Sequence, residues 1–554
     1  MMKRLIVLAL IAMCWKSAGF AQDQPKDTTV TMPKLEIPEI TIVGKKAITL
    51  PFARKGEIYD VNIFQAPPPD SSLLGERMET AMPVGSMPVD EEKRDPLHAS
   101  AEGAFGNYST GAIRAYLDYL KGRWKFFGNA GFASTEGYTS NGNASSFDLA
   151  ANMQSLFTTD NNALKTLQLT ATTKLLTEKY GMFAFSDVQR NRQDFSLDAS
   201  LNSIDRRGIT IDLGIGTNFW SLTDDNVPGN TKTTAVSPKL TSAFAMNIGK
   251  VRWNNDLMFT SISLDYSTPT QSVTLVQLAS SAHWNLTDAW SAEGGLVIAD
   301  GSDLLGSERT IALPTAKVQW DSDDRQQFSF FWMPGMQLNS YDYWTRYNPY
   351  LMREINLEPE RIPVNLGITY SITKQSITFD ASVSFTQFSN KGVILGSSSL
   401  YKLSIPAYNV NGNLWLEYVE ANQTRFELSA LYRQSDNFRV NLSGLVEPTY
   451  ATGSSDQLPM TPLLKMNVKA EYDLPKPVTL WASLEMWSEQ NVDLMATRTL
   501  DGAVLLNAGA STTIVPRTLI SASLHNLLGM SYAWWAGYQA PGFQFSLEAK
   551  VNLK

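Results

Sequence analysis

Long stretches of this 554-residue chain alternate strictly between apolar and polar residues. In 376–386 the even positions are polar, whereas the odd positions carry Ile377, Phe379, Ala381, Val383 and Phe385. The same period of two runs through 464–473 and 543–553. It predicts β-strands with one apolar and one polar face. Two architectures fit: a soluble sandwich with the apolar face inward, or a membrane barrel with that face toward lipid.

The lengths of the connections favour the barrel. Short polar turns recur roughly every 40 residues, about one long hairpin, and mostly longer connections lie between them. Ten such turns bound eleven hairpins, which predicts an all-β, transmembrane antiparallel β-barrel of about 22 strands, with 20 or fewer as the alternative. Short turns and both chain ends then lie on the periplasmic side. The predicted turns are 121–122, 158–162, 205–207, 249–250, 287–289, 321–325, 374–375, 421–422, 474–476 and 515–517; the long connections include 178–190, 222–234, 338–362, 390–406 and 434–460.

The composition agrees with a barrel. Charged residues make up 18% of the chain, below the ~25% usual for soluble proteins, and aromatic residues make up 11%. Five tryptophans lie within a few residues of short turns, where barrels carry aromatic girdles at the membrane interfaces. Core packing in a soluble domain is the alternative role for these side chains. They are Trp124, Trp253, Trp290, Trp320 and Trp481.

The first 21 residues have the layout of a secretory signal peptide. Lys3 and Arg4 precede an apolar run, and Ala21 closes a stretch of small residues. The only cysteine, Cys14, lies inside this segment; lipid attachment to it is an alternative that Met13 disfavours. Cleavage after Ala21 removes three basic residues and no acidic ones, so the mature chain is more acidic than the −8 of the full sequence. An acidic chain without cysteine argues against nucleic-acid partners, disulfides and thiol chemistry.

Residues 22–95 differ from the rest, because they contain Pro67-Pro68-Pro69 and few apolar residues that recur with any period. We expect an extended or disordered periplasmic segment before a barrel over 96–554. One β-prone stretch stands out, formed by Glu39, Ile40, Thr41, Ile42 and Val43. Such a stretch is suited to add a strand to a partner's sheet edge. An ordinary linker patch is the other interpretation.

Several motifs in the second half resemble those of the TonB-dependent receptors. Their order and spacing over about 340–554 match the family better than any one of them does, and the resemblance implies a barrel of 22 strands. The family's final Arg position is Phe543 here, and its Glu is Asn365. The motifs are Asn348-Pro349, Leu357-Glu358-Pro359-Glu360, Asn365-Leu366-Gly367, Leu458-Pro459 with Pro462, Leu524-His525-Asn526-Leu527-Leu528, Tyr532, and Gly537-Tyr538-Gln539-Ala540-Pro541-Gly542.

The same resemblance bears on the N-terminal segment. Glu39–Val43 is similar to the energy-coupling box with which the family binds a TonB-like periplasmic partner. Only about 50 residues separate Gly44 from the first predicted strand, however, which is too short for the folded plug domain of the family. We therefore expect no N-terminal plug. Candidates to fill the lumen are residues 47–95, the loops 338–362 or 434–460, or another protein, since barrels of this size are normally plugged.

Residues that carry covalent or metal chemistry are sparse. The three histidines, His98, His283 and His525, are scattered, and no metal-site spacing, phosphate loop or nucleophile motif occurs. His525 is expected in the barrel wall. Asp224-Asp225 and 300–303 are expected as solvated loop carboxylates, with weak Ca²⁺ binding as the alternative. The sequence predicts no catalytic residues, no metal, no cofactor and no enzyme.

One predicted outer loop is rich in aromatic residues beside a single arginine, a combination that stacks on flat or sugar-like ligands and holds an anion. Packing of loops against one another is the alternative role. The candidate ligand-binding residues are Tyr341, Tyr343, Trp344, Arg346 and Tyr347, followed by Tyr350.

We therefore expect an outer-membrane barrel that binds or transports an unidentified small solute. It would contact outer-membrane lipid and be inserted by the barrel-assembly machinery, although its last strand ends in Leu553-Lys554 rather than in an aromatic residue. The alternatives are a non-transporting scaffold barrel whose N-terminal tail recruits a periplasmic partner, and a soluble lectin-like sandwich.

Overall fold

The computed structural model describes residues 97–553, apart from 159–165, 183–187, 205–208, 226–231, 266–270, 303–307, 323–324, 375, 396–413, 436 and 476. The expected signal peptide, the segment 22–95 and the box-like stretch 39–43 lie outside these residues. No helix within the described ranges is long and apolar enough to cross a bilayer.

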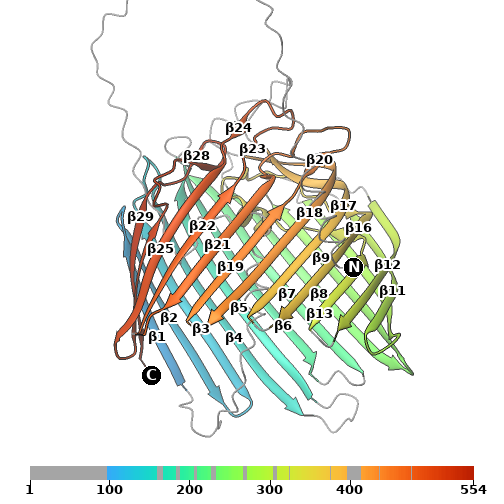
Figure 1. The fold of residues 1–554 in the computed structure, drawn as a ribbon. Helices are drawn as coiled ribbons and strands as arrows, with labels where there is room; N and C mark the ends of the chain where they lie inside the picture. Colours follow the sequence, from blue (N-terminus) through green and yellow to red (C-terminus); the bar gives the residue numbers. More distant parts are fainter. Residues whose placement is uncertain are drawn as a thin grey trace, which may run out of the picture. The chain divides into compact units, whose positions relative to one another are not determined.

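The wall is a closed antiparallel barrel of 22 strands, as predicted (Figure 1). Each strand pairs with its neighbours along the chain, and β1 pairs with β29 to close the ring. The wall strands are β1 Leu97–Gly106, β2 Thr110–Lys121, β3 Trp124–Thr135, β4 Ala144–Thr158, β5 Thr166–Gly181, β6 Gln189–Ser203, β7 Thr210–Asp225, β8 Lys232–Ile248, β9 Val251–Asp265, β10 Gln271–Asn285, β11 Trp290–Ser302, β12 Glu308–Ser322, β13 Gln326–Trp332, β16 Val364–Lys374, β17 Ile377–Leu395, β18 Trp415–Ser435, β19 Phe438–Val446, β21 Leu464–Asp473, β22 Val478–Trp487, β25 Ala503–Val515, β26 Thr518–His525 and β29 Gln544–Asn552.

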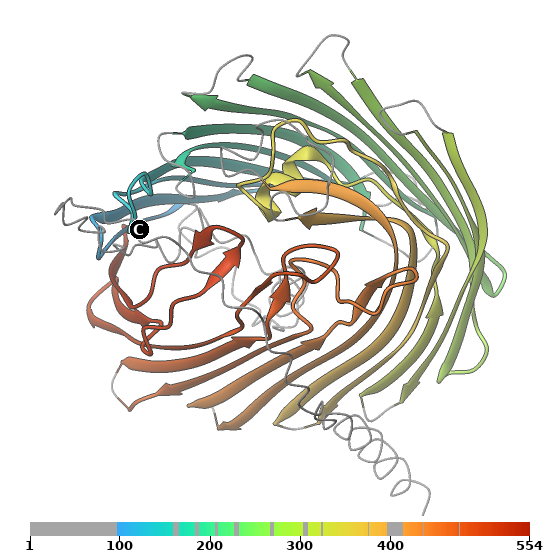
Figure 2. The same ribbon diagram turned by 90° about the horizontal axis from the view of Figure 1, so that it is seen from above.

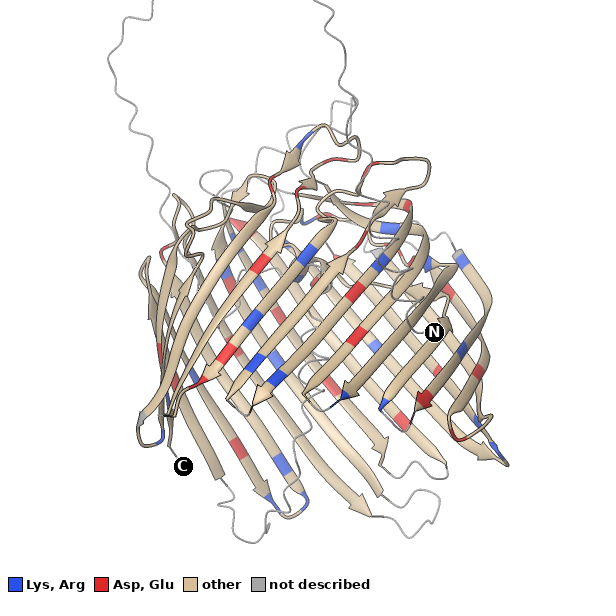
Figure 3. Ribbon diagram, viewed as in Figure 1, with Lys and Arg blue, Asp and Glu red and all other residues tan. Residues whose placement is uncertain are grey.

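The apolar face of the alternation points outward. Large apolar side chains along the wall are exposed, with Ile113 at 64% and Ile215 at 65% of full exposure. Charged residues lie on strands along the height of the wall (Figure 3), and the alternation places them on the lumen face. A soluble sandwich would bury the apolar positions, so the wall is that of a transmembrane barrel.

Connection lengths follow strand parity. Nine of the ten predicted short turns lie between consecutive wall strands at one end of the barrel, where β1 begins and β29 ends. We call this the short-turn end and the opposite rim the long-loop end. In two of these turns the chain reverses through glycines at positive φ, Gly122 at 58° and Gly249 at 63°.

One predicted turn is wrong. Ala421-Asn422 lies inside β18, which continues beyond the neighbouring wall and pairs there with the short strand β20 (Thr449–Ala451). Strand positions beyond the lipid need no apolar residue on the outer face. The apolar–polar alternation therefore stops there, and the sequence looks like that of a turn. The actual turn joins β18 to β19 between Ser435 and Phe438, and the long connection predicted at 434–460 is therefore 447–463.

The tryptophan prediction needs one correction. Trp124, Trp253 and Trp290 are exposed on the outer face near the short turns, and Trp290 lies beside Trp320 with ring centroids 6.5 Å apart. Trp481 instead faces the lumen, because it alternates with the exposed outward Leu480 and contacts Lys469 and His525. Nearness to a turn gives the height of a side chain in the wall, whereas the parity of the strand decides its face.

Small elements gather at the long-loop end (Figure 2). The segment between β13 and β16, residues 333–363, folds across the barrel mouth, and we call it the cap. It contains one α-helix of seven residues and a two-stranded sheet. These elements and the remaining short strands are β14 Gly335–Gln337, α3 Tyr341–Tyr347, β15 Glu360–Ile362, β23 Gln490–Asn491, β24 Thr499–Leu500, β27 Ala533–Trp535 and β28 Tyr538–Gln539.

Candidate functional site

The helix of the cap is built as a local unit and buries its aromatic face. Ser340 is the N-cap and accepts a hydrogen bond from the Tyr343 backbone N–H at 3.1 Å, which satisfies a donor of the first turn. Tyr341 is fully buried, with its ring centroid 4.2 Å from that of Trp220 in β7. On the other side Trp344 lies so close to Gly392 of β17 that a Cβ there would collide with the indole. The helix is thus wedged between two parts of the inner wall.

Arg190 of β6 fixes the chain that follows the helix. Its guanidinium is fully buried and makes a two-pronged pair with Asp224 of β7, at 2.7 and 2.9 Å. It also donates to the carbonyl oxygens of Pro349 at 2.9 Å and Leu351 at 2.6 Å. Arg353 of the cap pairs with the same Asp224 at 3.1 Å. A buried charge with this many partners ties the cap firmly to the wall.

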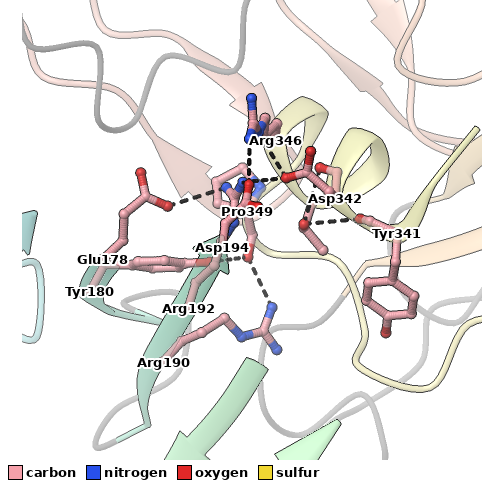
Figure 4. Close-up of polar contacts among 10 residues, drawn as sticks. Glu178, Tyr180, Arg190, Arg192, Asp194, Tyr341, Asp342, Arg346 and Pro349 are labelled. Carbon is pink, nitrogen blue, oxygen red and sulfur yellow. Dashed lines mark hydrogen bonds and ion pairs between the residues drawn. The ribbon is translucent and has the colours of Figure 1, made fainter. Parts of the chain in front are cut away.

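A second group of charges begins two residues further along β6, at Arg192 (Figure 4). Arg192 contacts Glu178 of β5 at 3.2 Å and Asp342 of the helix at 2.9 Å. Arg346 bridges Asp342, at 2.7 Å, and Asp194 of β6. We call these two groups together the clasp; it consists of Glu178, Arg190, Arg192, Asp194, Asp224, Asp342, Arg346 and Arg353.

The clasp contains a carboxyl group, that of Asp342, whose pKa lies near neutral pH. Burial raises the pKa of Asp342 to about 6, and its hydrogen bond with Asp194 acts in the same direction. Arg346 and Arg192 oppose this rise. Glu178, Asp194 and Asp342 together carry one more negative charge than Arg192 and Arg346, so a proton on Asp342 neutralises the group.

The predicted aromatic loop is therefore the helix of the cap, and its residues divide into two sets. Tyr341 and Trp344 are buried in protein packing, the alternative role considered for them. Tyr343 is 43% exposed, and Tyr347 is stacked on it at a centroid distance of 6.4 Å. Tyr350 is buried and stacks on Tyr538 of β28. Contact of the accessible members with a ligand stays a prediction.

Two cavities open on the lumen side of the cap, and Tyr343, Gln337 and Asn339 line both of them. The first has a volume of about 580 Å³ and lies against the inner faces of β6 to β10. The second, of about 380 Å³, lies against β16 to β18, with Lys391, Arg425 and Glu447 among its lining residues. Among the described residues, the cap thus folds into the mouth and leaves cavities between itself and the inner wall.

Asp224 corrects an expectation, since it is a buried member of the clasp instead of a solvated loop carboxylate. The pattern Arg190-x-Arg192-x-Asp194 was a usable signal, because three charges on one face of a strand demand partners. Asp224 and Glu178 on neighbouring strands supply some of these partners. The others lie about 150 residues away in the cap, which the sequence does not reveal. His525 lies in β26 as expected. Within the described ranges, no three His, Cys, Asp or Glu side chains are grouped to hold a metal ion.

Comparison with known proteins identifies the barrel type. No family model and no curated protein matches the sequence. Among solved structures, the FrpB iron transporter from Neisseria meningitidis superposes with a TM-score of 0.64 at 10% identity, covering 83% of this chain and 82% of that chain. The copper transporter OprC gives 0.61 at 12% identity, with 83% and 82% covered. The siderophore receptor PiuA from Acinetobacter baumannii gives 0.60 at 12% identity, with the same coverage. The fold implied by the sequence motifs, a barrel of the TonB-dependent-receptor type, is confirmed.

Proposed function

We propose that this chain is an outer-membrane barrel that takes up a small solute through its lumen. The observation that carries the proposal is the pair of cavities, about 580 and 380 Å³, left between the cap and the inner wall, each lined by polar and apolar side chains. Cavities of this size with mixed polar and apolar linings suit a binding compartment for a small molecule. The structural neighbours are named as iron, copper and siderophore transporters and receptors, which supports the same class of function.

The cap is the element that controls entry. Its helix packs between β7 and β17 through Tyr341 and Trp344, and ion pairs such as Arg192–Asp342, at 2.9 Å, join it to the wall. Contacts of this kind have two discrete states, formed and broken, which is what a lid requires. Selection of the solute is then made by lumen side chains, without covalent chemistry.

Coupling to a periplasmic partner is proposed through Glu39–Val43. A β-prone stretch near the N-terminus pairs readily with the sheet edge of another protein. The resemblance of this stretch to the coupling box, together with the receptor-type barrel, makes a TonB-like protein the proposed partner. A scaffold without transport is disfavoured, because it gives no reason for cavities beneath the cap.

The proposal is tested without assuming a substrate, by measuring which small solutes disappear from the culture medium. Cells that contain the wild-type chain, no chain, or a chain without residues 36–46 are grown side by side, and depletion of small solutes is measured by mass spectrometry. We expect at least one solute to be depleted faster only in cells with the wild-type chain. Equal depletion in all three, with equal amounts of folded barrel in the two cell types that contain a chain, would exclude energy-coupled uptake.

A further inference from the structure

Three neighbouring strands place an acid, a glycine and a base in one row on the inner wall. Asp198 of β6 is paired in register with Gly216 of β7, and Gly216 is paired with Lys239 of β8. All three line the 580 Å³ cavity below the cap. The Cα atoms of Asp198 and Lys239 are therefore two strand spacings apart, roughly 10 Å.

The glycine leaves a gap into which the acid leans. The carboxylate of Asp198 lies over Gly216, where any Cβ would collide with it. Lys239, on the far side of the gap, is exposed to the cavity. Within the described part of the chain, neither side chain has an ion pair or a side-chain hydrogen bond, whereas the clasp residues nearby are all paired. Two opposite charges thus face one cavity without satisfying each other.

The remaining surface of the cavity is uncharged, with apolar side chains such as Met258 and Leu275 beside groups that can form hydrogen bonds. Ser196, Asn218, Ser237 and Thr260 come from the wall, and Tyr343 covers the cavity from the cap. Toward the short-turn end, a third cavity of about 210 Å³ lies beside Gly214, the preceding inward position of β7, and Asp212 and Asp256 are among its lining residues. The space suits a short extended molecule lying across β6 to β8.

We propose that the Asp198–Gly216–Lys239 row binds a zwitterionic solute of the size of a short peptide, with its ammonium group on Asp198 and its carboxylate on Lys239. This inference rests on the proposed function and names its substrate class. A ligand that carries both charges pairs both side chains and lies over the glycine gap. A neutral sugar leaves both charges without a partner, and a bare metal ion lacks a group of three ligands in the described ranges.

The experiment is equilibrium dialysis of the detergent-purified full-length protein against radiolabelled triglycine. We expect saturable binding that N-acetyl-triglycine amide, which carries no charge, and maltose do not displace. The variants D198N and K239Q should each weaken binding about tenfold or more, because each removes one charge-assisted contact. K239R should retain binding. The matched control is D380N, since Asp380 is another inward wall carboxylate, on β17.

Three outcomes would overturn the inference: no saturable triglycine binding to the wild-type protein, displacement by maltose or the uncharged peptide, or equal binding by D198N, K239Q and D380N. The retarded migration of an unheated folded barrel on a gel checks each variant, and G216V, which fills the gap, is the substitute if D198N fails to fold. The medium-depletion assay separates the two proposals. Failure of triglycine binding with intact uptake of another solute removes only the substrate class.

Discussion

The inner wall carries arginine–carboxylate pairs in two very different settings. In the clasp, Arg190 is fully buried and joins Asp224 and two cap carbonyls. Near the short-turn end, Arg439 of β19 pairs with Glu471 of β21, but its side chain remains 43% exposed to the lumen. Pairs of the same chemistry therefore have different roles. Removing one partner of the buried pair leaves the other charge without compensation and strongly destabilises the folded state. An exposed pair contributes little to stability, so we expect the clasp, and not the Arg439–Glu471 pair, to hold the cap in place.

The largest expected effect comes from breaking the buried pair with Arg190→Ala. The change leaves Asp224 without its two-pronged partner and the Pro349 and Leu351 carbonyls without their donor. We expect the cap to lose about 3–5 kcal/mol of local stability, more than a hundredfold in its opening equilibrium. Hydrogen exchange of the backbone amides of 344–357 measures this, with Arg439→Ala as the matched control. Unchanged protection of these amides in Arg190→Ala would refute the role of the clasp in holding the cap.

The second effect is a pH dependence confined to the clasp. Burial raises the pKa of Asp342 to about 6, above the ~4 of an unfolded aspartate. A raised pKa means that the closed state binds the proton more tightly, so its extra stability is present below pH 4 and is lost as the pH rises through 6. We expect amides 341–347 to exchange roughly ten times more slowly at pH 5 than at pH 7.5, after correction for intrinsic rates.

Asp342→Asn provides the control for this pH effect. The asparagine cannot ionise, so the ratio between the two pH values should fall to about one. The same ratio in Asp342→Asn as in the wild-type chain would show that another group is responsible.

The smallest effect is expected for Arg439→Ala at the exposed pair. Water and salt screen this contact, and Lys469 also contacts Glu471, at 2.8 Å. We expect a loss of less than about 1 kcal/mol in the free energy of unfolding, and a smaller loss at high salt. Unfolding in urea with the protein in detergent or bilayers measures it. A loss as large as that of Arg190→Ala would mean that exposure does not separate the two settings.

The sequence specified the wall better than the cap, for a physical reason. Contact with lipid requires an apolar residue at every second position of a wall strand. The strands, their number and the turns at 121–122 and 249–250 can therefore be recognised from one sequence. Beyond the lipid that constraint ends, which is why Ala421-Asn422 imitated a turn. Trp481 was assigned to the wrong face because its height in the wall was considered without the parity of its strand.

The candidate site was only partly predictable. The aromatic run 341–350 marked the cap correctly as unusual, but its division into buried Tyr341 and accessible Tyr343 depends on helical periodicity in a segment expected to be a loop. The cap partners of Arg190 and Arg192 lie about 150 residues away in the chain. The Asp198–Gly216–Lys239 row depends on the registers of two strand pairs, which alternation alone leaves undetermined.

The pairing of β1 with β29 has a consequence for synthesis. Register partners such as Ala101 and Val551 come from opposite ends of the wall sequence, and the Leu553 N–H donates to the Ala99 carbonyl at 2.7 Å. Until the last strand is in place, β1 and β26 are both unpaired edges, which invite aggregation in water. The unfinished wall must therefore be kept apart from other chains until β29 joins it. A chain circularly permuted to begin at Gly249-Lys250 would complete the same ring with a different final strand.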